Sequence, residues 1–152
     1  MSAADHLIKP IAITLGDAAG IGPEIIVKAF RDAPEQMQGC VVVGDAAVLQ
    51  RALQVLTQTA PNSAQLRLQR LAALRDMPQA VLPGVISFVQ AVPALTEADL
   101  PAWGQICASA GKLAADCVVW AANAALRGEV SALVTAPLHK EALFAAGVPF
   151  PG

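Results

Sequence analysis

The stretch Gly16-Asp17-Ala18-Ala19-Gly20-Ile21-Gly22-Pro23-Glu24 decides the fold of this chain. It follows a short apolar run, Ile11 to Leu15, and precedes a segment from Glu24 to Arg31 whose apolar residues share one helical face. The run is closed by Gly16, which is typical of a buried strand. Pro at the first helical position, with an acidic residue beside it, is typical of a helix start. The stretch is therefore predicted to be a glycine-rich loop between a strand and a helix.

Such a loop can bind a ligand. Its glycines allow close approach of another group, and the free N–H groups of the helix start favour an anion. In an open α/β sheet, ligands bind at the carboxyl ends of strands, where this loop is expected. The spacing of Gly16, Gly20 and Gly22 fits neither the dinucleotide-binding G-x-G-x-x-G motif nor a P-loop. On the residues alone, a ligand loop and a tight turn stabilised by Asp17 explain the stretch equally well.

The rest of the chain alternates predicted strands and helices. Further strands are expected at Cys40 to Val43, Gln65 to Leu71, Val85 to Val89 and Ala132 to Thr135. Helices are expected from an Asp45 N-cap to about Leu56, from about Trp103 to Arg127 and from Lys140 to Ala146, with loops at 57–64 and 93–101. The longest helix carries an apolar stripe formed by Ile106, Ala110, Leu113, Cys117, Trp120 and Ala124. This alternation predicts an α/β fold with a mostly parallel sheet and flanking helices.

Composition narrows the class of protein. Hydrophobic residues make up 55% and charged residues 14% of the 152 residues, which excludes a disordered chain. The 10 basic and 12 acidic residues form no basic cluster, which argues against nucleic-acid binding. The longest uncharged run, Met77 to Thr96, contains three prolines and argues against a membrane span. The N-terminus lacks signal-peptide features, and three widely spaced cysteines indicate buried thiols rather than disulfides. A cytoplasmic protein is expected.

A second informative stretch is Val134-Thr135-Ala136-Pro137-Leu138-His139-Lys140-Glu141-Ala142-Leu143. It predicts a strand end, a proline turn and a helix start, which places His139 and Lys140 near the carboxyl edge of a strand. Lys suits a phosphate or carboxylate, and His can hydrogen-bond a substrate or exchange a proton. The simpler explanation from the residues alone is a solvated His–Lys pair. If both stretches are functional, they are expected to face a common cleft that holds an anionic substrate.

Both stretches resemble signatures of the 4-hydroxythreonine-4-phosphate dehydrogenase family, which shares the fold of isocitrate and isopropylmalate dehydrogenases. The first is similar to Gly-Asp-Pro-Ala-Gly-Ile-Gly-Pro-Glu, with Ala18 in place of proline, and the second to Thr-Ala-Pro-(Ile/Leu)-(Asn/His)-Lys-Glu-Ala. The resemblance runs from about Ile11 to Gly152. It implies that residues 1–152 are the N-terminal portion of a longer, two-domain dehydrogenase. About 1–135 would form the α/β region, and about 136–152 would begin the segment that leads to the second domain.

The resemblance also implies an activity. It implies NAD-dependent oxidation, with decarboxylation, of 4-phosphooxy-threonine in pyridoxal 5′-phosphate (vitamin B6) biosynthesis, with NADP as a second candidate cofactor. A divalent metal (Zn, Mg or Co) would be bound by histidines beyond residue 152, so no metal ligand is expected in this chain, and this fragment alone is expected to be inactive. A homodimer is expected. His139 and, less directly, Lys140 would contact the substrate. The loop residues implied for the active site or cofactor are Asp17, Gly20, Gly22 and Glu24.

Several alternatives stay open at this point. Within the same class, the substrate could be a four-carbon sugar-acid phosphate or an aromatic cis-dihydrodiol. A different class is an acyl or phosphoryl transferase on a related fold, which would need no NAD. A third is an inactive truncated or binding fragment.

Overall fold

The computed structural model describes residues 9–61, 65–80 and 82–149. Its centre is a five-stranded sheet with the order β3-β4-β2-β1-β5, in which every neighbouring pair is parallel. The strands are β1 (Ile11–Thr14), β2 (Cys40–Gly44), β3 (Arg67–Leu71), β4 (Val85–Gln90) and β5 (Ala132–Thr135). The prediction of an α/β fold with a mostly parallel sheet is confirmed.

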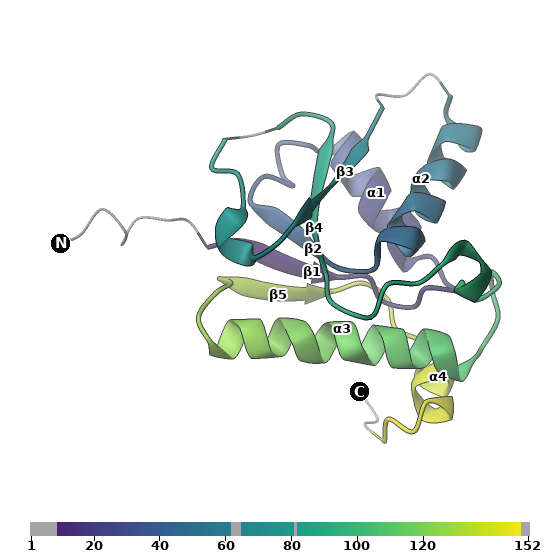
Figure 1. Ribbon diagram of the computed structural model, residues 1–152. Coiled ribbons are helices and arrows are strands. Elements are labelled where there is room, and N and C mark those ends of the chain that lie inside the picture. The colour runs from purple at the N-terminus through teal and green to yellow at the C-terminus, as the bar shows by residue number, and fades with distance from the viewer. Residues whose placement is uncertain (1–8, 62–64, 81, 150–152) are drawn as a thin grey trace.

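Helices cover both faces of the sheet. The helices α1 (Gly22–Asp32) and α2 (Ala46–Thr59) lie on one face, and α3 (Ala108–Leu126) lies on the other (Figure 1). The short helix α4 (Lys140–Ala145) packs mainly against α3. Two single turns, η2 (Leu74–Asp76) and η3 (Glu97–Asp99), interrupt the connections on either side of β4.

The position of each strand explains its composition. β2 reads Cys-Val-Val-Val-Gly and is buried along its whole length, because it lies between β4 and β1 and is covered on both faces. β5 is at the edge of the sheet, and of its four residues only Leu133 is even half-buried. The core therefore lies under β1, β2 and β4, and the β5 side of the molecule is the most open.

Several predicted boundaries differ from the structure, most by one or two residues. α2 continues to Thr59, although residues from 57 onward were expected to form a loop. The hydroxyl groups of Thr57 and Thr59 donate to the carbonyls of Leu53 and Val55, both at 2.9 Å, so these polar residues are compatible with the helix. The first strand ends at Thr14 instead of Leu15, and the third begins at Arg67 instead of Gln65. The predicted loop residues 62–64 and the Pro151-Gly152 end lie outside the described residues.

The start of the long helix is also different. α3 begins at Ala108, not near Trp103, and Ile106 is 50% exposed instead of belonging to the buried stripe. The segment before the helix is diverted because the N–H of Gly104 donates to the carbonyl of Ala19 at 2.7 Å. From Ala110 onward the stripe is buried as predicted, except that Trp120 is half-buried. The predicted stop at Gly128 agrees with its φ of +70°.

Candidate active site

The two informative stretches lie at the same edge of the sheet. β1 and β5 are parallel neighbours, and Thr14 at the end of β1 pairs with Thr135 at the end of β5. The chain leaves β1 for α1 on one face and leaves β5 for α4 beside α3 on the other (Figure 1). Loops that diverge in this way from adjacent parallel strands form a topological switch point, the usual ligand site of open α/β sheets. We call the two segments the glycine loop (residues 15–21) and the β5–α4 loop (residues 136–139).

The glycine loop and the β5–α4 loop are in direct contact. The N–H of Asp17 donates to the carbonyl of Pro137 at 2.9 Å. Gly16 has a φ of +71°, and a Cβ there would lie 2.5 Å from the Pro137 oxygen. A Cβ on Gly22 would lie 2.5 Å from the Leu15 oxygen and 3.2 Å from Cβ of Ala136. These glycines are therefore required for the packing of the two loops.

Asp17 stabilises the glycine loop from within. Its side chain is buried, and its Oδ1 accepts the N–H of Ala19 at 2.9 Å, while its carbonyl accepts the N–H of Gly20 at 3.1 Å. This is the turn-stabilising role that the residue type suggests. Glu24 is half-buried in the first turn of α1 and pairs with Lys28 at 2.6 Å. The N-cap residue Ile21 makes no side-chain hydrogen bond to the start of α1.

His139 and Lys140 begin α4 at this edge. His139 is the N-cap residue and is half-buried, and Lys140 is exposed. The Nδ1 atom of His139 is buried and has no hydrogen-bond partner among the described residues. A buried imidazole nitrogen without a partner is uncommon, because leaving such a group unpaired costs free energy. This nitrogen therefore has unused hydrogen-bonding capacity at the edge of the site.

Two residues that support the site were missed or undervalued from the sequence. A Cβ on Gly111 of α3 would lie 1.9 Å from the carbonyl oxygen of Ala142, so only glycine lets α4 approach α3 this closely. Arg51 of α2 donates to the carbonyl of Ala18 at 2.7 Å, within the glycine loop. Neither contact has a local sequence signal, since each joins segments far apart in the chain.

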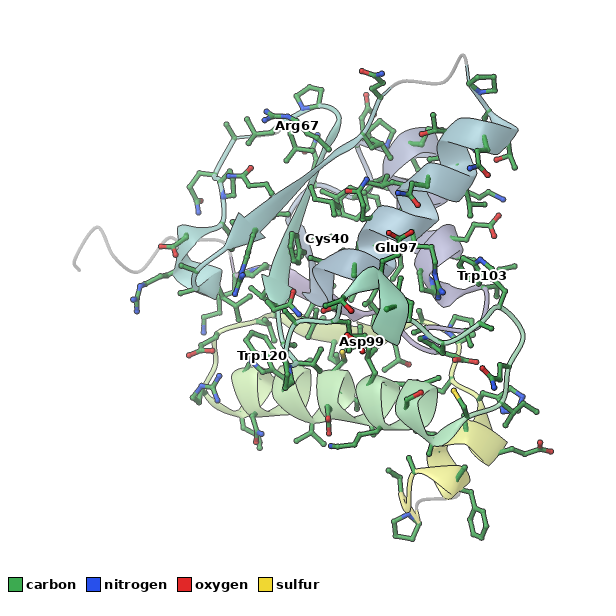
Figure 2. All side chains as sticks on the ribbon, turned by 45° about the vertical axis from the view of Figure 1, so that its right-hand side comes forward. Cys40, Arg67, Glu97, Asp99, Trp103 and Trp120 are labelled. Carbon is green, nitrogen blue, oxygen red and sulfur yellow. The ribbon has the colours of Figure 1, made fainter. Side chains whose placement is uncertain are left out.

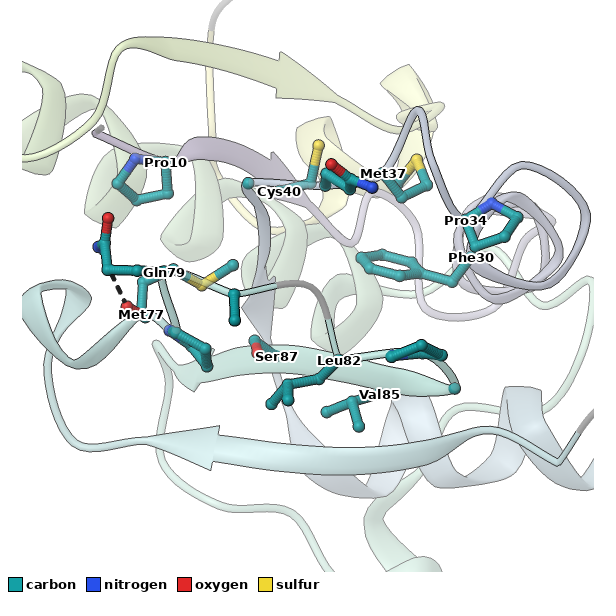
Figure 3. A pocket seen from close by; sticks show the side chains of 16 residues that line it. Pro10, Phe30, Pro34, Met37, Cys40, Met77, Gln79, Leu82, Val85 and Ser87 are labelled. Carbon is teal, nitrogen blue, oxygen red and sulfur yellow. Dashed lines mark hydrogen bonds between the residues drawn. The ribbon is translucent and has the colours of Figure 1, made fainter. Parts of the chain in front are cut away.

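Two cavities lie away from these loops. One, of about 300 Å³, is at the amino ends of β2 and β4, where Cys40, Ser87 and Val85 line it together with prolines and methionines (Figure 3). Another, of about 670 Å³, lies between α2 and β3. Neither is lined by the glycine loop or by His139. The two loops form a shared surface, and neither of these two cavities is the common cleft that was expected between them.

The titratable groups do not form a metal centre in this part of the chain. Within residues 9–61, 65–80 and 82–149, no group of three or more His, Cys, Asp or Glu side chains is placed to hold a metal ion. Cys40 and Cys117 are buried, and Cys107 is only half-buried, which corrects the expectation of three buried thiols. Burial raises the pKa of Cys117 to about 12, with smaller contributions from Asp116 and Asp45.

The described helices differ from membrane-spanning helices. None of those described combines the length and the apolar composition that a bilayer crossing requires.

The fold is of the α/β class in which ligands bind beyond the carboxyl ends of parallel strands. Within that class, residues 36–152 match the model of the pyridoxal phosphate biosynthetic protein PdxA, and the chain belongs to this family. It is 46% identical to a D-threonate 4-phosphate dehydrogenase of Salmonella typhimurium over 95% of this chain and 41% of the relative. It is 36% identical to a 4-hydroxythreonine-4-phosphate dehydrogenase of Beijerinckia indica over 97% of this chain and 40% of the relative.

Solved structures agree with this assignment. The crystal structure of 4-hydroxythreonine-4-phosphate dehydrogenase from Klebsiella pneumoniae has a TM-score of 0.81 and 35% identity, over 97% of this chain and 42% of that one. A terephthalate 1,2-cis-dihydrodiol dehydrogenase from Burkholderia xenovorans has a TM-score of 0.66 and 30% identity, over 96% of this chain and 39% of that one. The chain spans about 40% of the length of the curated relatives it matches.

Proposed function

We propose that the full-length protein is an NAD(P)- and divalent-metal-dependent dehydrogenase of a four-carbon, 4-phosphorylated hydroxy acid. The first candidate substrate is 4-phosphooxy-threonine, whose oxidation and decarboxylation serve pyridoxal 5′-phosphate biosynthesis. The second is D-threonate 4-phosphate, which is favoured by the 46% identity to a dehydrogenase of that substrate, against 36% for a 4-hydroxythreonine-4-phosphate dehydrogenase. The two substrates share a phosphate, a carboxylate and the hydroxyl to be oxidised, so one site chemistry suits both.

The observation that carries the proposal is the unpartnered Nδ1 of His139 at the switch point. It lies at the start of α4, next to the exposed Lys140. A neutral imidazole nitrogen can accept a substrate hydroxyl proton or, when protonated, donate to an oxygen. The Lys140 ammonium is suited to a phosphate or carboxylate oxygen. Together they provide an anchor for an anionic hydroxy acid.

The backbone of the glycine loop completes this wall of the site. The N-cap residue Ile21 provides no side-chain hydrogen bond to the start of α1. The backbone amides in the first turn of α1 can therefore face a polar group of the substrate or cofactor. We assign Asp17, Gly20, Gly22 and Glu24 to this wall. Asp17 and Gly22 act there by holding the backbone, through the Asp17 turn and the close contact with Ala136.

The cofactors supply the redox chemistry. When bound, NAD(P) accepts the hydride, and the metal acts as a Lewis acid on the substrate oxygens. We assign the histidine ligands of this metal to the protein beyond residue 152, as the family resemblance implies. We also propose a cytoplasmic homodimer; the free cysteines agree with a reducing compartment, and light scattering of the full-length protein tests the dimer.

Turnover by the full-length protein tests the function. NADH or NADPH formation is followed with 4-phosphooxy-threonine, D-threonate 4-phosphate and an aromatic cis-dihydrodiol, with added divalent metal and after chelation. We expect metal-dependent reduction of the cofactor with at least one phosphorylated substrate and release of one carbon dioxide per turnover. Turnover of the dihydrodiol alone would contradict the proposal. Acyl- or phosphoryl-transfer activity without cofactor reduction, or no activity at all, would favour the other classes.

Substitution of Lys140 tests the residue assignment. Lys140→Met removes a charged partner of the substrate, and hydrogen bonds to charged groups contribute about 1.5–3 kcal/mol, so we expect KM to rise roughly 10- to 150-fold. Lys112→Met is the control, because Lys112 is an exposed residue of α3 that pairs with Asp116 of the same helix, at 2.7 Å. His139→Gln is expected to lower kcat/KM by at least the same factor as Lys140→Met. Unchanged KM in Lys140→Met would exclude Lys140 as a substrate contact.

A further inference from the structure

The β4–α3 connection (residues 91–107) crosses the site edge of the molecule and is attached to it near its start and near its end. Near its start, the N–H of Leu95 donates to Oδ2 of Asp45 at 3.0 Å. Near its end, the N–H of Gly104 donates to the carbonyl of Ala19 at 2.7 Å, inside the glycine loop. Figure 2 shows Glu97, Asp99 and Trp103 along this connection, in front of the α1–α2 layer. The connection therefore lies against the outer side of the glycine loop.

Arg51 joins the connection, the glycine loop and α2 through one guanidinium group. Its Nη2 donates to the carbonyl of Ala18 and its Nη1 to the carbonyl of Pro101, both at 2.7 Å. The ring of Trp103 covers the guanidinium, with 4.1 Å between Cζ and the ring centroid. The two bonds and the stacked ring hold Ala18 and Pro101 at a fixed separation.

This arrangement is not the one that stability alone favours. The ion pairs found among the described residues do not include Arg51, and its buried Nε has no hydrogen-bond partner there. Burial also lowers the pKa of Arg51. Arg51 is half-buried, and even partial burial of a cation without a carboxylate costs free energy. An apolar residue would not provide the two N–H donors that bind the carbonyl groups of Ala18 and Pro101.

We propose that Arg51 is a positioning residue: its guanidinium holds the Ala18 carbonyl and the β4–α3 connection so that the glycine loop keeps the conformation that binds substrate. Arg51 acts through Ala18 and touches no reacting group. Its effect on substrate binding rests on the proposed function, whereas its effect on the loop does not. Lysine cannot replace it, because a single ammonium lacks the planar fork that reaches both carbonyls and the face that stacks on an aromatic ring.

Amide hydrogen exchange of the full-length protein tests the effect on the loop. In Arg51→Lys and Arg51→Met, the amides of Ala19, Gly20 and Gly104 are expected to exchange roughly tenfold faster or more, as the loss of hydrogen bonds from a charged group predicts. Amides of the buried strand β2 are expected to be unchanged, which separates a local effect from general destabilisation. Arg70→Lys and Arg70→Met are the matched controls, because Arg70 is exposed on β3.

Steady-state kinetics of the same variants test the effect on binding. Both Arg51 variants are expected to raise KM for the phosphorylated substrate about tenfold while kcat changes less than threefold; a merely structural role would lower the active fraction and leave KM unchanged. Wild-type exchange at the three amides, or a wild-type KM in an active Arg51→Lys protein, would overturn the inference. If KM is unchanged in Arg51→Lys but raised in Arg51→Met, the positive charge alone is sufficient and the positioning role is wrong. If the unsubstituted protein shows no turnover, the proposed function fails, and the exchange data still decide whether Arg51 holds the loop.

Discussion

Replacing Gly16 with alanine tests the contact between the two loops of the site. A non-glycine residue at the Gly16 φ of +71° is strained by about 1–2 kcal/mol. The added Cβ would also lie 2.5 Å from the Pro137 oxygen and 2.9 Å from the Ala136 oxygen, and both are backbone atoms that cannot rotate away. Overpacking of this kind costs about 1–3 kcal/mol, and loss of the Asp17–Pro137 hydrogen bond adds about 1 kcal/mol. We expect Gly16→Ala to lower the free energy of unfolding by about 3–6 kcal/mol.

Gly39 offers a matched control for the backbone strain. Its φ is +73°, but a Cβ there would meet nothing within 4 Å. Gly39→Ala is therefore expected to cost only about 1–2 kcal/mol, which leaves about 2–4 kcal/mol for the contact between the loops. Thermal unfolding of the 152-residue chain, followed by circular dichroism, measures this difference. A protein of this size loses about 2–4 °C per kcal/mol, so the Tm of Gly16→Ala should lie about 4–16 °C below that of Gly39→Ala. Equal Tm values for the two variants would refute the packing of the loops.

Four further predictions concern the supports of the site and the cysteine thiols. Gly111→Ala should raise KM of the full-length enzyme about tenfold because α4 must move away from the new Cβ, while a gain in helix propensity of about 1 kcal/mol limits the fall in Tm. Asp45→Asn should lower the free energy of unfolding by about 1–3 kcal/mol, measured by urea denaturation, because Asp45 is buried and accepts from the Ala47, Val48 and Leu95 amides. A thiol reagent should label Cys107 in the folded protein and Cys117 only after unfolding, as mass spectrometry can show. Since the pKa of Cys117 is raised to about 12 by burial, its stabilising contribution is complete below about pH 9 and is lost as the pH rises toward 12.

Much of the fold follows from local sequence signals. The apolar run before the loop and the start of α1 appear within one residue of where the sequence predicts them, and Asp45 is the N-cap of α2 as predicted. Each of these signals depends on the residues of its own segment, so no knowledge of distant contacts is needed. The position of both motifs at the carboxyl edge also follows, because each directly succeeds a buried or edge strand in a parallel sheet.

The failures arise where distant segments decide the local conformation. The residues before α3 have helical apolar spacing, yet the hydrogen bond from Gly104 to Ala19 and the stacking of Trp103 on Arg51 keep them out of the helix. Arg51 itself looks like an ordinary polar residue of an amphipathic helix. Its role depends on two carbonyl groups in other segments, which no sequence spacing encodes. The same reason hides the contact of Gly111 with α4.

A structure of the full-length protein with a bound phosphorylated hydroxy acid tests the central claim most directly. The account predicts that the substrate lies at the carboxyl edge of β1 and β5, with Nδ1 of His139 and Nζ of Lys140 within hydrogen-bond distance of its oxygens. Substrate bound with neither side chain in contact, for example in the cavity at the amino ends of β2 and β4, would contradict it.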